Sequence, residues 1–494
     1  MNRKVDCFLV FTDQSASQKL VDQCKESSLV NQIYVLAYNQ VQLTDCEVIV
    51  VEEYGSCSTT RLIAKTLCAD FALLALNESS IEIGQGAIER LMQVAEFTDA
   101  PMVYADYLEM KDGVLSPYPV IDYQQGSLRD DFNFGPVRFF RSEVLKAFRY
   151  ENHETLKHAG CYALRLRASR MGKLVHIPEC LFTKVETDTR ASGEKQFDYV
   201  KAAARERQLE MEQVCTAHLR EIGALLLAPF PETNFSENFE TEATVIIPVR
   251  NRIKTIRDAI ESVLIQSPGF RFNLIVVDNY STDGTSEILK EYASQGKLTH
   301  IIPERKDLGI GGCWNEAVFH PDCGKFAVQL DSDDLYADEN TLQIIINKFY
   351  EENCAMVIGS YRMTNFKLEE IPPGVIDHRE WTDDNGPNNA LRINGLGAPR
   401  AFYTPVLREI RVPNVSYGED YALGLAISGM YKIGRVYQPV YLCRRWDDNT
   451  DSSLDVVKQN AHNLYKDRIR TFELQARILR NKKSDPDKAW FDES

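Results

Sequence analysis

A short apolar segment that ends in three carboxylates is the part of the sequence best suited to chemistry. Residues 326–330 are apolar apart from one glutamine, and Asp331, Ser332, Asp333 and Asp334 follow them. Unpaired acids cannot continue a buried strand, so we expect them at the strand end, where open α/β sheets bind ligands. Asp331 and Asp333 are two residues apart, so in an extended chain both can converge on one hard cation. The pattern predicts a site for Mn²⁺ or Mg²⁺; the alternative is an Asx-rich turn before the next helix.

Length, charge and composition limit the classes of protein to which the chain can belong. With 494 residues it is too long for one hydrophobic core, so we expect two or three domains. The formal net charge of −16 argues against a nucleic-acid partner, which would require a basic surface. No apolar run reaches the length of a membrane span and no signal-peptide core is present, so we expect a cytoplasmic protein. The 12 cysteines have no metal-like spacing and are expected to be buried thiols.

The two halves of the chain look like copies of one domain. Short β-branched runs alternate with helix-like stretches in the first half, which indicates an α/β layer fold with a mostly parallel sheet. Residues 161–171 run parallel to residues 420–430, with Tyr, Ala, Leu, Leu, Ser and Met at matching places. The acids are not shared, because 77–80 (Asn-Glu-Ser-Ser) stand opposite 331–334, and Gly160-Cys161 stand opposite Glu419-Asp420. We expect a first half that keeps the fold without the chemistry; alternatively, it binds a sugar or nucleotide without metal.

Further motifs follow the other strand-like runs of the second half. A proline and three polar residues end the first run, an aspartate ends the second, a glycine-rich turn comes next, and two acids begin a late helix. Because such residues gather at one edge of a sheet, they are expected to form a nucleotide-sized crevice. The residues in these motifs are Pro248, Arg250, Asn251, Arg252, Asp278, Gly309, Gly312, Asn315, Glu419 and Asp420.

The order of these motifs resembles the family 2 glycosyltransferases, which have a GT-A fold. The resemblance covers nearly all of residues 243–453. It implies a metal-dependent enzyme of the hexosyltransferase type, which moves a sugar from a UDP-sugar or GDP-sugar donor to a hydroxyl of a carbohydrate or other acceptor. Inversion of configuration is expected and retention stays open. The implied setting is the synthesis of a polysaccharide or glycoconjugate.

The resemblance also assigns roles on the donor side of the crevice. Asp278 would read the base of the nucleotide, unless it only caps the following helix. The loop with Gly309 and Gly312 would lie against the nucleotide, with Asn315 behind it. Arg250, Arg252, Arg305 and Lys306 are candidate partners of the diphosphate, although a solvated surface role is equally open for each.

On the metal, Asp331 would contact the ribose or the ion, Ser332 would occupy the middle of the DXD motif, and Asp333 would be the principal ligand. Asp334 is expected to cap the next helix. The loop 441–453 has no histidine where the family usually has one, so Asp447 is a weak candidate for the third ligand.

On the acceptor side, Asp420 would take the proton from the attacking hydroxyl, with Glu419 as the second choice. The alternative is that both acids only favour a helix N-terminus. Trp381, in a Gly-, Pro- and Asn-rich segment, either stacks on a sugar or belongs to the core.

The predicted architecture is an α/β chain of two tandem GT-A-like, Rossmann-like domains plus a C-terminal helical tail. We place the degenerate copy at 1–224, a proline-containing linker at 225–242, the catalytic domain at 243–455 and the tail at 456–494. The tail would pack on a domain or on a second subunit of a homodimer, with peripheral membrane contact as the other possibility. Two other functions stay open: a sugar nucleotidyltransferase, and a non-catalytic scaffold that binds sugar or nucleotide.

Overall fold

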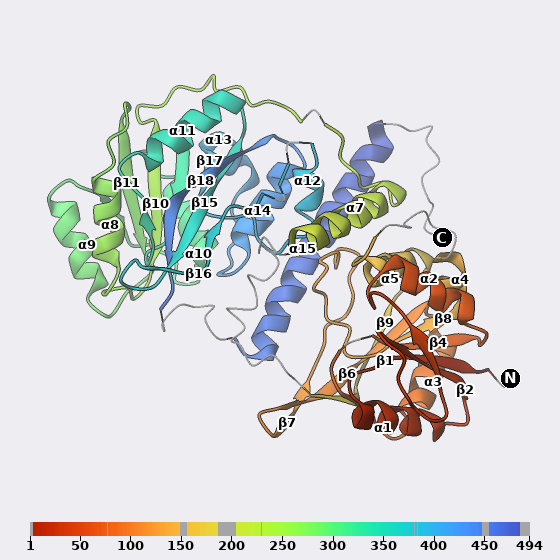
Figure 1. Cartoon of the computed structure of the whole chain (residues 1–494). Helices are drawn as coiled ribbons and strands as arrows, with labels where there is room; N and C mark the ends of the chain where they lie inside the picture. Colours follow the sequence, from red (N-terminus) through yellow and green to blue (C-terminus); the bar gives the residue numbers. More distant parts are fainter. Residues whose placement is uncertain are drawn as a thin grey trace. The chain divides into compact units, whose positions relative to one another are not determined.

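A computed structural model describes residues 3–76, 78–148, 156–185, 204–228, 230–379, 381–382, 384–446 and 454–484. Among these residues the chain forms two compact units. The first unit contains the chain up to 185 together with 204–225 and 454–484, and the second contains 226–446. The long C-terminal helix thus belongs to the first unit, although it follows the second in the sequence (Figure 1).

The two units have the same sheet topology, which confirms the predicted α/β fold with two similar domains. The first sheet has nine strands in the order β3-β2-β1-β4-β8-β6-β9-β5, with β7 beside β6. The second has the order β12-β11-β10-β13-β17-β15-β18-β14, with β16 beside β15, so every strand of one sheet has a counterpart in the other. Both sheets are mixed, since parallel central strands meet antiparallel ones. No helix among the described residues has both the length and the apolar character needed to cross a membrane.

The helices and strands have the following bounds. The first unit contains β1 (Val5–Val10), α1 (Gln14–Lys25), β2 (Val30–Ala37), β3 (Glu47–Val50), α2 (Cys57–Thr66), β4 (Phe71–Ala75), β5 (Ile81–Ile83), α3 (Ala87–Thr98), β6 (Met102–Lys111), β7 (Val114–Tyr118), β8 (Arg138–Arg141), α4 (Ser142–Phe148), α5 (Gly160–Met171), β9 (Val175–Val185), α7 (Arg205–Glu221) and α15 (Val456–Ser484). The second contains β10 (Ala243–Val249), α8 (Ile256–Leu264), β11 (Phe272–Asp278), α9 (Thr285–Ser294), β12 (Thr299–Ile301), α10 (Ile310–Val318), β13 (Phe326–Gln329), β14 (Leu335–Tyr336), α11 (Thr341–Glu352), β15 (Met356–Thr364), β16 (Glu370–Ile376), α12 (Gly386–Asn389), β17 (Arg400–Tyr403), α13 (Thr404–Ile410), α14 (Glu419–Ser428) and β18 (Ile433–Arg444).

The register of the central strands fixes which residues of the two units correspond. Strand β4 pairs with β1 in the same register as β13 pairs with β10. Counting along these ladders, Leu76 takes the place of Asp331, and Glu78 takes the place of Asp333. The pairing of Asn77 with Asp331 that we expected from the sequence is therefore wrong by one residue, and Asn77 itself lies outside the described residues. The reason is that an apolar residue, Leu76, follows the end of β4, so the apolar pattern alone does not mark the strand end.

The segment 226–242, predicted to be a linker, is packed on the second unit. The backbone N–H of Thr233 donates to the carbonyl of Asn353 over 2.7 Å. The Phe235 ring meets the rings of Phe326 and Tyr403 edge to face, with centroids 5.4 and 5.1 Å away. Pro229, one of the two prolines that suggested a linker, lies outside the described residues.

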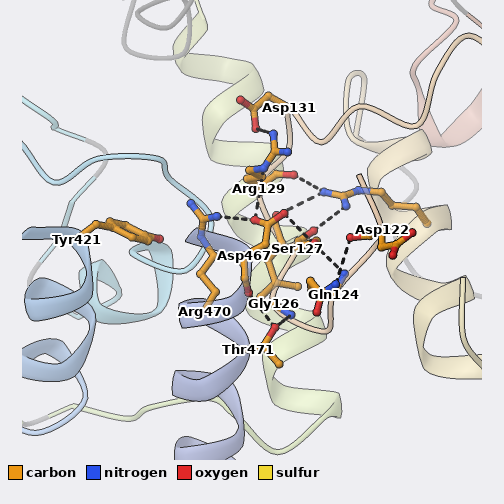
Figure 2. Close-up of polar contacts among 12 residues, drawn as sticks. Asp122, Gln124, Gly126, Ser127, Arg129, Asp131, Tyr421, Asp467, Arg470 and Thr471 are labelled. Atoms are coloured by element: carbon orange, nitrogen blue, oxygen red, sulfur yellow. Dashed lines mark hydrogen bonds and ion pairs between the residues drawn. The ribbon is translucent and has the colours of Figure 1, made fainter. Parts of the chain in front are cut away.

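Buried hydrogen bonds and ion pairs hold helix α15 on the first unit. Asp467, with no exposed side-chain surface, accepts hydrogen bonds from Arg470 at 2.7 Å and Ser127 at 2.8 Å, and Arg129 lies 3.4 Å away (Figure 2). A buried carboxylate is stable only when such partners replace its water. The amphipathic pattern of the tail predicted a packed helix, and the first unit of the same chain is what it packs on.

Gly126 lets the loop 124–131 approach α15 closely. Its backbone N–H donates to the Thr471 hydroxyl over 2.9 Å, and a Cβ there would lie 2.6 Å from the Asp467 carbonyl oxygen. The absence of a side chain is what allows this contact.

We expect Gly126→Ala to lower the free energy of unfolding by about 1–3 kcal/mol, because the added methyl group overpacks the loop against the helix. The matched control is Gly269→Ala, whose Cβ would meet only the flexible Gln343 side chain at 3.6 Å. Urea denaturation of both variants measures the difference, and equal stability of the two would contradict this account.

Candidate active site

The predicted metal motif lies directly after β13, at the carboxyl edge of the second sheet. Asp331 accepts a hydrogen bond from the Gln329 side chain at 2.9 Å, and its backbone N–H donates to the Tyr441 hydroxyl over 3.1 Å. Asp333 is largely buried, with 15% of its side chain exposed. Burial raises the pKa of Asp331 and the neighbouring Asp333 carboxylate adds to this, whereas Arg400 opposes it. The site therefore gathers negative charge where water cannot fully screen it.

Arg400, at the start of β17, links the metal motif to the proposed base, and we did not predict this role from the sequence. Its Nη1 forms an ion pair with the Asp420 carboxylate at 2.7 Å, and its Nε donates to the Gly397 carbonyl over 3.1 Å. Burial acts to lower the pKa of Arg400, but the carboxylates of Asp420, Asp331 and Glu419 raise it overall. Arg400 is thus a permanent positive charge between the two groups of acids. Its counterpart in the first half, Arg138, is the sequence signal that could have identified it.

Glu419 and Asp420 begin α14, as predicted, and differ in their electrostatics. Burial, reinforced by the Asp420 carboxylate, raises the pKa of Glu419 to about 8. The Oε2 atom of Glu419 is buried, and no described residue forms a hydrogen bond with it. Asp420 has Arg400 as its partner, so at neutral pH Glu419 is a neutral acid beside an ion-paired carboxylate.

Arg444, at the end of β18, holds the metal motif in place and was also missed. Its Nε donates to the Asp333 carbonyl over 2.6 Å, and its Nη1 pairs with Asp258 of α8 at 2.7 Å. Its backbone N–H donates to the Asp334 carboxylate over 2.8 Å. The prediction that Asp334 caps the next helix is therefore wrong: α11 begins at Thr341, and the Asp334 carboxylate instead binds a neighbouring strand.

The motif after β10 approaches the acids through one residue. Arg252 Nε lies 3.7 Å from the Asp333 carboxylate and, although it is buried, has no hydrogen-bond partner among the residues that the structure describes. Asn251 has a positive φ of 54° and binds the backbone N–H of Thr282 through its side-chain oxygen at 2.7 Å. Arg250 is exposed. Of these three, the structure brings Arg252 to the acids.

Several residues predicted on the donor side have structural contacts of their own. Asp278 is fully buried, and its carboxylate accepts hydrogen bonds from the Ser281 backbone at 2.9 Å and from the Ser286 hydroxyl. Burial opposes ionisation of this group, but bonds from His300, Ser286 and Ser281 lower its pKa overall. Asp278 thus binds the turn after β11 and does not cap α9, whose first backbone N–H, that of Thr285, donates to Asp283 over 3.0 Å; the role of Asp278 in reading the base stays a prediction.

The glycine-rich loop and the residue behind it pack on the segment before α14. The side chain of Asn315 both donates to and accepts from the backbone of Val412, at 2.8 and 3.0 Å. A Cβ on Gly309 would lie 2.6 Å from the Val415 carbonyl carbon, and one on Gly312 would collide with Asn414. These residues therefore shape the wall that carries Glu419 and Asp420.

The remaining predicted residues are placed as follows. The ammonium group of Lys306 lies 5.6 Å from the centre of the Tyr280 ring. Trp381 is 2% exposed, so the structure supports its alternative role in the core. Pro248 is part of β10, and the carbonyl of Ser332 accepts a hydrogen bond from Thr255 over 2.9 Å. Asp447, the candidate third ligand, lies outside the described residues.

In the first unit, His158, Glu206 and Glu210 come close enough together to hold a metal ion. Glu210, however, already accepts hydrogen bonds from the backbone N–H groups of Lys157 at 2.9 Å and His158 at 2.6 Å. These groups belong to the turn before α5, so Glu210 holds that turn in place. Lys157 also pairs with Glu206 at 3.1 Å, and the group is explained without a metal.

Comparisons with known proteins agree with the motif order. Residues 244–403 match the model of "Glycosyl transferase family 2". An uncharacterized glycosyltransferase of Rickettsia felis is 31% identical over 201 residues, which is 40% of this chain and 32% of the relative. The putative teichuronic acid biosynthesis glycosyltransferase TuaG of Bacillus subtilis is 30% identical over 126 residues, 26% of this chain and 49% of the relative. This chain thus spans between a third and a half of the length of these relatives.

Among solved structures, the mannosyltransferase PcManGT from Pyrobaculum calidifontis, in complex with GDP-Man and Mn²⁺, aligns with a TM-score of 0.36 and 16% identity. The alignment covers 60% of this chain and 88% of that one.

The raised pKa of Glu419 predicts a pH-dependent stability. Between its ordinary pKa of 4.5 and the folded value of about 8, the folded protein keeps a proton that the unfolded chain has lost. Stability from this group therefore falls as the pH rises through that window. In urea denaturation we expect the unfolding free energy of Glu419→Gln, relative to wild type, to increase between about pH 5 and about pH 8. A difference that is the same at both pH values would contradict the assignment.

The contacts of Arg444 predict a loss of stability when its guanidinium group is replaced. Arg444→Lys keeps the charge but cannot bind Asp258 and the Asp333 carbonyl together, so we expect a loss of about 1.5–3 kcal/mol. Arg305→Lys is the control, since both partners of its ion pair with Asp307 are well exposed, and it should change stability by no more than about 0.5 kcal/mol. A small effect at Arg444 in thermal denaturation would show that the two bonds do not hold the motif.

Proposed function

Because residues 244–403 belong to glycosyl transferase family 2, we propose that the second unit transfers a sugar, as a hexosyltransferase, from a nucleoside diphosphate donor to an acceptor hydroxyl with inversion. The observation that carries the proposal is the convergence of the metal motif, Arg400 and Asp420 at one edge of the sheet. The carboxyl edge of such a sheet is where ligands bind.

The residues of the metal motif fit a divalent cation. The carboxylate oxygens of Asp331 and Asp333 are hard ligands of the kind that Mn²⁺ and Mg²⁺ prefer. The buried Nε of Arg252 has no hydrogen-bond partner within the described part of the chain and lies beside Asp333, so it is placed to bind a phosphate oxygen. When bound, the cation would supply Lewis-acid stabilisation of the negative charge that grows on the departing diphosphate. The UDP-sugar or GDP-sugar would thus lie between this motif and α14.

Asp420 is the proposed base. A carboxylate paired with a guanidinium stays ionised, so Asp420 can accept the proton of the acceptor hydroxyl while Arg400 orients it. Glu419 is less suited to this role, because its pKa of about 8 keeps it protonated at neutral pH. Glu419 can instead donate a hydrogen bond from its carboxyl group, whose Oε2 has no hydrogen-bond partner among the described residues. Together the two acids would hold the acceptor on the face opposite the leaving nucleotide.

The test separates donor binding from turnover. We expect Asp333→Ala to abolish metal-dependent binding of the donor, because the principal ligand of the cation is removed. Asp420→Asn should bind the donor like the wild type and lose turnover by at least about 100-fold, as expected for removal of a general base. Calorimetry with UDP-, GDP- and dTDP-sugars, with and without Mn²⁺, measures binding, and slow hydrolysis of the donor measures turnover.

Arg257→Ala is the matched control, since Arg257 forms an exposed ion pair with Glu291 and is not among the predicted donor-binding residues, and it should retain both properties. Donor binding that survives in Asp333→Ala would overturn the metal assignment. Absence of any donor binding in the wild type would favour the scaffold alternative.

A further inference from the structure

The first unit contains a cavity at the place that corresponds to the active site of the second. Its volume is about 290 Å³, far above the roughly 10–15 Å³ that one water molecule needs and near the lower end of ligand pockets. Leu76 and Glu78, the counterparts of Asp331 and Asp333, line it, and so does Cys161, which stands where Asp420 stands in the second unit. The cavity therefore occupies the carboxyl edge of the first sheet.

Arg138 lines this cavity and is the counterpart of Arg400. Arg138 pairs with Tyr104 of β6 as Arg400 pairs with Ile358 of β15, at the same step of the two ladders. Arg400 has a carboxylate partner, whereas the partner of Arg138 is the Cys161 thiol. Burial lowers the pKa of Arg138, and no carboxylate among the described residues lies within ion-pair distance of it. A desolvated guanidinium with no anion beside it favours an anionic ligand.

The walls of the cavity add aromatic surface and hydrogen-bond acceptors. The guanidinium of Arg138 lies 5.5 Å from the centre of the Phe134 ring, and the Phe132 ring is 4.5 Å from that of Phe134. Tyr54 and Tyr162 are further lining residues. Aromatic faces suit the C–H face of a sugar ring, and the carboxylate of Glu78 can accept hydroxyl groups. Arg207, from α7, lines the cavity with an exposed side chain and supplies a second positive charge.

Two features argue against metal-dependent binding here. Leu76 offers no oxygen where Asp331 does in the second unit, so the pair of acids is broken. Glu78, at the place of Asp333, accepts a hydrogen bond from the Tyr38 hydroxyl at 2.9 Å, and two further acids, Glu53 and Asp130, line the cavity beside its arginines. Arg165 also lines the cavity, but we do not assign it to the ligand, because its guanidinium donates to the carbonyls of Ser127, at 2.9 Å, and of Arg129.

We propose that this cavity binds, without metal, a monosaccharide unit that carries a carboxylate or a phosphate. Arg138 and Arg207 bind the anionic group, the aromatic wall contacts the ring, and Glu78 accepts a hydroxyl. The proposal does not depend on the transfer reaction of the second unit.

Calorimetry on the full chain in the presence of EDTA tests the proposal with four probes. D-glucuronate and glucose 6-phosphate carry the two anionic groups, and D-glucose and inorganic phosphate each lack one half of the ligand. We expect at least one anionic sugar to bind ten times more tightly than glucose or phosphate, and the stronger of the two identifies the preferred anion. Equal or weaker binding of both anionic sugars overturns the proposal.

Arg138→Gln should lower the affinity for the anionic sugar at least tenfold. Arg400→Gln, the same change at the matching position of the second unit, should leave this affinity unchanged. The reverse result places the probe in the second unit and overturns the proposal. Arg207→Gln removes the second positive charge at an exposed position and should weaken binding of the anionic sugar, while binding of glucose is unaffected. If Arg138→Gln does not fold, this variant decides, and an unchanged affinity for the anionic sugar contradicts the site.

Discussion

The second unit depends on the balance between crowded carboxylates and two buried arginines. Asp331, Asp333 and Asp334 follow one strand, and burial with mutual repulsion raises the pKa of the first and of the last. Unopposed, such acids would take up protons and lose the charge that a cation requires. Arg444 donates a hydrogen bond to the backbone of the motif, and Arg400 places a positive charge between the motif and α14. Arg400 thus offsets part of this shift at Asp331 and favours the charged form that a cation would require.

The first unit has the same sheet without the acids that face Arg400 in the second unit. Its strand order is that of the second sheet, so the fold does not need the acids. Replacement of Asp331 by Leu76 and of Asp420 by Cys161 removes the repulsion together with the chemistry. The fold depends instead on the buried strands around β1 and β4, which are apolar on both faces except at Asp6, as expected for parallel strands covered by helices. The same scaffold thus carries different side chains at the same edge of its two sheets.

Local patterns predicted the strands and the place of the metal motif, because both depend on residues that are near one another in the sequence, and comparison of the two halves predicted their common topology. The partners of that motif could not be read in this way. Arg444 meets Asp334 across 110 residues, and only the sheet order brings them together. Asp334 looked like a helix cap for the same reason, since the sequence shows the nearest helix and not the nearest strand. Trp381 was ambiguous because its segment is polar and rich in Gly, Pro and Asn, which suggests an exposed loop, whereas its ring is buried.

Arg138 is the residue that a purely architectural first unit does not explain. A guanidinium in a desolvated site costs free energy unless an anion or several acceptors replace its water, and an apolar residue of similar volume would often stabilise the fold as well or better. Its described partners are a neutral thiol and an aromatic face. The cost is recovered if the cavity beside it receives an anionic group, as a phosphate or carboxylate would provide. The change from Asp420 to Cys161 then leaves Arg138 available to an anionic group, in a cavity that Glu53, Glu78 and Asp130 also line.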